Sequence, residues 1–129
     1  MSPTSPHLAC NLTVFPPDER ERLVAAAKQL LVRAVEARVD PHQIALRFGG
    51  AKDERAHLRE LADFIAHDRR CCPFLRHGIA CDPRQGAVWL TLAGTGEVLT
   101  DLITELRRHV PPAVWPQARG CVRATNRDL

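Results

Sequence analysis

The segment over residues 53–72, DERAHLRELADFIAHDRRCC, places the strongest constraint on the fold. Leu58, Leu61 and Ile65 recur at the three- and four-residue spacing of one helix face, while charged side chains occupy the remaining faces. A helix with a single apolar stripe must bury that stripe against another layer of secondary structure. The segment therefore predicts a helix that covers a second element.

Short alternating segments supply the second layer. Apolar residues alternate with other residues in LACNLTV (8–14), HQIALRF (42–48), LRHGIAC (75–81) and AVWLTLA (87–93), a pattern typical of half-buried strands. The last two segments flank DPRQG, which has the composition of a hairpin turn. Helical stripes also occur over 18–39 and from a capping Thr95 to Leu106.

This order of elements predicts an α+β fold. We expect a two-layer sandwich in which a small, mostly antiparallel sheet of about four strands packs against three helices. A single domain is expected over residues 8–110. Residues 1–7 are expected to be flexible, and residues 111–129, with several prolines and no period, to form an irregular tail partly docked through Trp115.

Charge and composition exclude several classes of protein. The net charge is only +3, and the arginines are scattered, so nucleic-acid binding by this chain alone is not expected. No apolar run reaches the length of about 18 residues that spans a membrane. The start, MSPTSPHLAC, lacks the basic and apolar regions of a secretion signal, so we expect a cytoplasmic protein with reduced thiols. The odd count of five cysteines also argues against a framework of paired disulfides.

Two adjacent cysteines end the helix over 53–72. On a helical wheel Cys72 points toward the core and Cys71 toward the edge of the buried face. Asp68 lies one turn earlier, where its carboxylate can reach over both sulfurs. Pro73 disfavours helical geometry at Cys72, so the two thiols need not diverge as they would in an ideal helix.

Adjacent thiolates suit a soft metal ion once further ligands are present. Cys10 is the candidate third thiolate, because it lies on the inward face of the first predicted strand. Mercury(II), arsenic(III) or zinc would suit such a site, and zinc could take a carboxylate or a histidine as its fourth ligand. The predicted metal site consists of Cys10, Cys71, Cys72, Asp68 and His67.

Two other functions remain open at this point. In a thiol-dependent redox enzyme Cys71 would be the nucleophile, His67 the base and Cys72 the resolving thiol. The chain shows no glycine loop that could stabilise an oxyanion, so binding is favoured over catalysis. In a non-catalytic interaction domain the cysteines would only pack in the core, as is also expected of Cys81. The expected partners are a metal ion and either another protein or a second copy of the chain.

The segment LADFIAHDRRCCPFLRHGIA, followed by VWLTLAGTGEV, resembles a group of small bacterial proteins with a Cys-Cys-Pro-Phe signature. Similar segments form tails on mercury-resistance-type regulators and occur near heavy-metal resistance genes. The resemblance covers about residues 8–106 and marks Cys10, Cys71, Cys72, Pro73 and Phe74. Asp68 stands where the group usually has glutamate. The resemblance implies a role in handling heavy metals.

Overall fold

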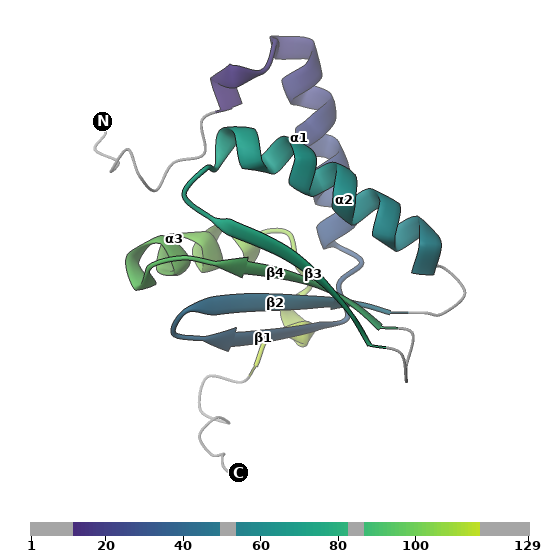
Figure 1. Ribbon diagram of the computed structural model, residues 1–129, viewed down its shortest axis with the longest axis vertical. Coiled ribbons are helices and arrows are strands. Elements are labelled where there is room, and N and C mark those ends of the chain that lie inside the picture. Colours follow the sequence, from purple (N-terminus) through teal and green to yellow (C-terminus); the bar gives the residue numbers. More distant parts are fainter. Residues whose placement is uncertain (1–11, 50–53, 83–86, 117–129) are drawn as a thin grey trace.

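The computed structural model describes residues 12–49, 54–82 and 87–116 (Figure 1). The helices are α1 (Pro17–Leu31), α2 (Glu54–Cys71) and α3 (Gly96–Leu106), with short 3-10 helices η2 (Leu12–Val14) and η4 (Pro112–Val114). The strands are β1 (Glu36–Asp40), β2 (Gln43–Phe48), β3 (Arg76–Asp82) and β4 (Ala87–Ala93). The predicted α+β class, with three helices and a four-stranded antiparallel sheet, is confirmed for the described residues.

The strands form one antiparallel sheet in the order β1–β2–β4–β3. The predicted hairpin is present as β3 and β4, with Ile79 opposite Leu90. β4 lies between β2 and β3, so α2, which connects those two strands, crosses the sheet and packs on β3 and β4. This crossing brings the end of α2 to the start of β3, where the paired cysteines lie.

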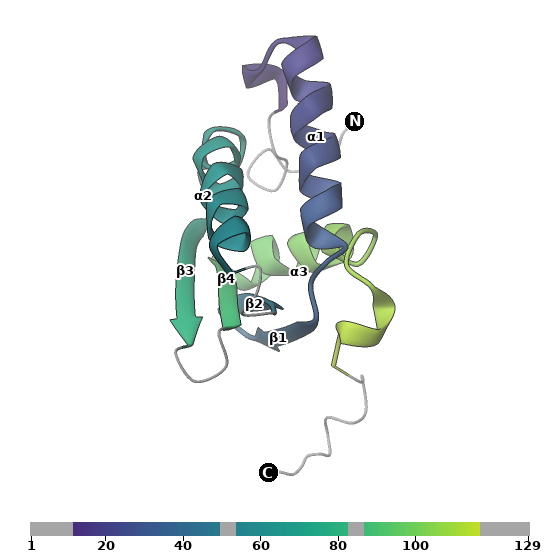
Figure 2. The same cartoon turned by 90° about the vertical axis from the view of Figure 1, so that its right-hand side faces the viewer.

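The helices cover one face of the sheet, and the views in Figures 1 and 2 show all three on the same side. Alternate residues of the central strands face them and are at most 2% exposed: Ile44, Leu46, Phe48, Val88, Leu90 and Leu92. They join Leu30, Leu61, Leu99 and Leu106 of the helices in one core cluster. On the opposite face Trp89 lies under the Arg38 guanidinium, 4.4 Å from the ring centroid. The fold is thus a two-layer sandwich.

The predicted first strand, residues 8–14, is wrong over its described part. Leu12–Val14 form a 3-10 helix, and residues 8–11 lie outside the described residues. Pro16 and Pro17 follow directly, and Pro16 is the N-cap of α1, so the chain must turn here rather than continue along a sheet. Phe15 is consequently buried at 2% exposure in a small cluster with Cys71 and Cys72.

The fourth strand of the sheet is β1 instead, which the prediction of a helix over residues 18–39 missed. α1 ends at Leu31, and the chain then pairs Glu36–Asp40 with β2. The Asp40 carboxylate accepts a hydrogen bond from the His42 backbone N–H at 2.8 Å, which closes the turn between the two strands. Branched valines before the turn favour the extended chain, so hairpin pairing prevailed over the helical stripe.

Two further expectations have opposite outcomes: the core position expected of Cys81 is wrong, and the docking expected of Trp115 is confirmed. Cys81 is exposed rather than buried, because β3 is an edge strand whose far end the helices do not cover. Trp115, in the expected irregular tail, is docked in the core at 4% exposure. In the part of the chain that the structure describes, no helix has both the length and the apolar character needed to cross a membrane.

Candidate metal centre

The end of α2 places the paired cysteines. α2 ends at Cys71, and the Cys72 N–H still donates to the Asp68 carbonyl oxygen at 2.7 Å. Pro73 has no N–H to continue the helical ladder and disfavours helical geometry at Cys72, so the chain leaves the helix there. Leu75 N–H then bonds to the Cys72 carbonyl at 3.2 Å, and β3 begins one residue later. The predicted break at the Cys-Cys-Pro sequence is present.

Three side chains converge at this end. The Cys71 Sγ atom lies 3.7 Å from Cys72 Sγ and 3.7 Å from Asp68 Oδ1. The ligand atoms of all three residues lie within 4.8 Å of one another, and Cys71 and Cys72 are 4% and 1% exposed. A disulfide bond is about 2.05 Å long, so the two neighbours are not bonded to each other. The three side chains lie close enough to hold one metal ion.

The oxidation state of Cys72 sets a condition on that site. Cys72 is disulfide-bonded, whereas Cys71 and Cys81 are free thiols. Cys10, the predicted third thiolate, lies outside the described residues. A site with two thiolates from Cys71 and Cys72 therefore requires the reduced protein, and the place of Cys10 in it stays a prediction.

The environment of Cys71 stabilises the protonated thiol. Burial raises the pKa of Cys71 to about 11, aided by the negative charge of Asp68 and by the hydrogen bond to its carboxylate. A thiol with this pKa is protonated at neutral pH and is a weak nucleophile. A bound cation reverses this preference, because a coordinating thiol loses its proton outright. The site is thus suited to a positive ion rather than to an unassisted thiolate.

Asp68 is held in place by a histidine that the sequence analysis missed. His77 Nε2 lies 2.7 Å from Asp68 Oδ2, and the His77 side chain is 1% exposed. One oxygen of Asp68 thus faces His77, and the other faces Cys71. His77 Nδ1 is buried without a hydrogen-bond partner among the described residues. An imidazole that anchors a carboxylate beside a ligand position resembles the outer contacts that orient metal ligands.

A signal for His77 was present in the sequence. His77 alternates with Ile79 in the strand that follows the Cys-Cys-Pro break, and it pairs with the core residue Leu92. Its side chain therefore faces α2. The missing information was the register between that strand and the helix, which brings a side chain nine residues further along the chain onto Asp68.

His67, by contrast, is not in the group of three ligand residues. Its Nδ1 lies 2.8 Å from the Asp63 carbonyl oxygen, within the helix, and its ring centroid lies 6.1 Å from that of Phe15. The structure therefore brings together Asp68, Cys71 and Cys72 from the predicted set and leaves His67 beside them.

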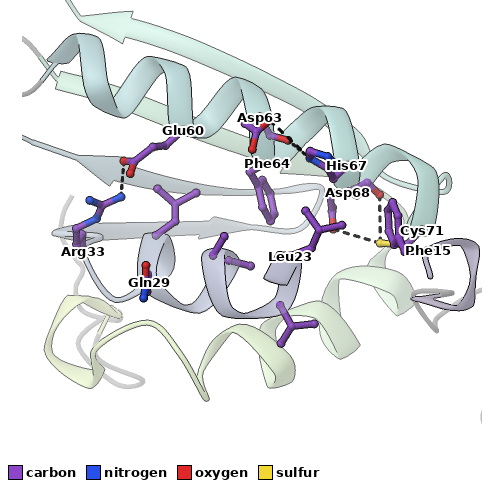
Figure 3. Close-up of a pocket in the computed structure, with 14 residues that line it drawn as sticks. Phe15, Leu23, Gln29, Arg33, Glu60, Asp63, Phe64, His67, Asp68 and Cys71 are labelled. Atoms are coloured by element: carbon purple, nitrogen blue, oxygen red, sulfur yellow. Dashed lines mark hydrogen bonds and ion pairs between the residues drawn. The ribbon is translucent and has the colours of Figure 1, made fainter. Parts of the chain in front are cut away.

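A cleft between α1 and α2 leads to the site (Figure 3). Its volume is about 200 Å³, and Cys71, Asp68 and His67 line one end of it. Arg33, two residues after the end of α1, and Glu60 of α2 form an ion pair at the other end of the cleft in Figure 3. Cys72 is not among the lining residues, so the cleft gives access to the Cys71 thiol.

Comparisons with models of known protein families, with curated proteins and with solved structures find no match for this chain. The resemblance to the Cys-Cys-Pro-Phe proteins therefore stays a prediction.

Proposed function

We propose that this protein is a cytoplasmic accessory protein that binds a soft metal ion through Cys71 and Cys72 in the reduced state. Asp68 supplies an oxygen ligand, or a charge beside the ion, and Cys10 is the expected third thiolate. The observation that carries the proposal is the convergence of two sulfurs and a carboxylate within 4.8 Å at one buried helix end. Storage, transfer or sensing of the ion in heavy-metal resistance would use the same contacts.

The spacing of the sulfurs favours a particular coordination. Two thiolates bound about 2.3 Å from a tetrahedral ion are separated by roughly 3.8 Å, and by roughly 4.6 Å when the ion is linear. The 3.7 Å between Cys71 Sγ and Cys72 Sγ agrees with the tetrahedral value. Once Cys72 is reduced, a zinc-like ion would thus fit these sulfur positions with little movement, whereas mercury(II) bridging both sulfurs would push them apart.

The charges also support a cation. Two thiolates and the Asp68 carboxylate would place three negative charges at a site from which water is largely excluded. Such a cluster is unfavourable unless a metal ion neutralises it. His77 keeps the carboxylate oriented toward Cys71 through the 2.7 Å contact.

One observation favours a different function, that of a thiol-dependent redox enzyme. The free Cys71 thiol lies 3.7 Å from the sulfur of Cys72, which is disulfide-bonded, and this is a suitable start for thiol–disulfide exchange. The raised pKa of Cys71, about 11, opposes it, because exchange requires the thiolate. His67, the expected base, contacts Asp63 instead. Metal binding is therefore the better-supported function, and packing alone would leave the paired Asp68 and His77 unexplained.

The test is a cadmium(II) titration of the full chain, reduced with a phosphine and freed of metal. Wild type should develop a thiolate-to-metal charge-transfer band that saturates at one ion per chain. Cys71→Ser/Cys72→Ser should lose the band. Cys81→Ser is the matched control, because Cys81 is an exposed thiol away from the site, and it should behave as wild type. A band of full height in the double variant would overturn the proposal.

A further inference from the structure

The cleft between α1 and α2 has the character of a ligand site rather than of a packing gap. Its middle is apolar, formed by Leu23, Ala27 and Leu30 of α1 and by Phe64 of α2. Figure 3 shows Leu23 and Phe64 between the Arg33–Glu60 ion pair and the Cys71 sulfur. The metal centre by itself accounts only for the Cys71 end. A bare metal ion would leave the apolar part of the cleft unused.

We propose that the cleft takes the organic group of an organometal cation, R–Hg⁺ or a chemically similar species, whose metal binds Cys71. This inference rests on the proposed function, since it uses the same thiol. Cys71 is suited to the role because its thiol is free and lines the cleft. A cation that already carries one organic group needs only one thiolate, so binding does not require Cys72 to be reduced.

The binding step is a ligand exchange without oxidation or reduction. The S–H bond of Cys71 and the bond between mercury and its leaving ligand X break, and an S–Hg bond forms. The proton and X⁻ pass to solvent. Asp68 Oδ1, 3.7 Å from the sulfur, then lies beside the metal cation instead of beside a thiol proton.

Geometry and volume fix the size of the organic group. Two-coordinate mercury is linear, so when the metal lies on the cleft side of the Cys71 sulfur, the group R opposite that sulfur extends further into the cleft. An apolar protein cavity of about 150 Å³ binds benzene. The cleft, at about 200 Å³, is thus large enough for a phenyl group, and the Phe64 ring offers an aromatic contact. A methyl group would leave most of the apolar wall uncovered.

The test measures the preference for phenylmercury over methylmercury. Each cation is titrated against glutathione as competitor, in a Cys81→Ser background, and the ratio of the two affinities is taken within each variant. This ratio cancels any change in the intrinsic reactivity of the thiol. Burial of the phenyl group should give about a tenfold preference or more, and Cys71→Ser should abolish it.

A matched pair of variants locates the organic group. Ala27→Phe fills the apolar middle of the cleft and should remove the preference, whereas Ala25→Phe, on the exposed face of the same helix, should keep it. Leu23→Ala, which removes part of the wall without adding volume, should also reduce the preference and serves if Ala27→Phe fails to fold.

The outcomes separate this inference from the proposed function. An unchanged preference in Ala27→Phe and Leu23→Ala, or no preference in wild type, would overturn the cleft assignment even if cadmium(II) still binds to Cys71 and Cys72. Loss of the cadmium band with a preserved phenyl preference would instead refute the two-thiolate site and keep the cleft as a ligand site on Cys71.

Discussion

The buried thiol of Cys71 predicts that the folded protein loses stability at alkaline pH. Its pKa is about 11 in the folded state, compared with an ordinary value of 9.0. As the pH rises past 9.0, the thiol in the unfolded chain loses its proton while the folded thiol keeps it. The unfolded state then binds fewer protons than the folded state, so the free energy of unfolding must fall as the pH rises. Replacing Cys71 by alanine should remove this part of the pH dependence.

The size of the effect follows from the two pKa values. At pH 8 both states are protonated, and the contribution is negligible. At pH 10 the unfolded thiol is about nine-tenths ionised and the folded thiol about one-tenth, which corresponds to a factor of about ten in the folding equilibrium, or about 1.4 kcal/mol. The loss is complete above the folded pKa of about 11, where it approaches roughly 2.7 kcal/mol.

Urea unfolding at pH 8 and pH 10 measures this loss of stability. Between these two pH values wild type should lose about 1.4 kcal/mol more stability than Cys71→Ala. The small cavity left by the substitution lowers the free energy of unfolding equally at both pH values, so it cancels from the comparison. The titration of every other group shared by the two proteins cancels as well. Equal losses in the two proteins would refute the argument that burial beside Asp68 holds the thiol protonated.

Three further changes test the site and the fold. Asp68→Asn removes the charge beside Cys71, so the pKa of the Cys71 thiol should fall from about 11 yet stay above 9.0, since burial still raises it. Thiolate absorbance in a Cys81→Ser background measures this pKa. An unchanged pKa would assign the whole effect to burial. Leu61→Ala, at a fully buried position, should lower the free energy of unfolding by about 2–5 kcal/mol in urea, and a loss under about 1 kcal/mol would contradict the core assignment. Thr95 accepts a hydrogen bond from the Val98 N–H as N-cap of α3, so Thr95→Ala should lower stability by about 1 kcal/mol while Thr95→Ser keeps most of it; equal losses would argue against the cap.

Strong local signals explain where the sequence predicted the fold correctly. The apolar stripe and the Cys-Cys-Pro break delimit α2 to within a residue at each end, because helix periodicity and the effect of proline act over a few neighbouring residues. The hairpin of β3 and β4 follows from alternation around a turn-rich segment. The errors at residues 12–14 and 36–40 lie where a local pattern competed with a neighbouring turn, and the turn prevailed.

Some residues of the candidate metal centre could likewise be predicted from the sequence, and others could not. Asp68, Cys71 and Cys72 are within one helical turn of each other, so their convergence could be read from helix geometry alone. His77 and the cleft could not, because they depend on which strand and which helix pack beside α2. The packing distance between α1 and α2 also decides the depth of the cleft, and no local pattern contains it.

Residue order by itself determined the class of fold, the end of α2 and the group of two cysteine sulfurs and a carboxylate, since each depends on interactions between residues a few positions apart. Only the tertiary structure decided that His77 holds Asp68, that Cys71 is buried enough to stay protonated, and that its thiol lines an apolar cleft. These properties arise from burial and from contacts between distant segments, which exist only once the layers have packed.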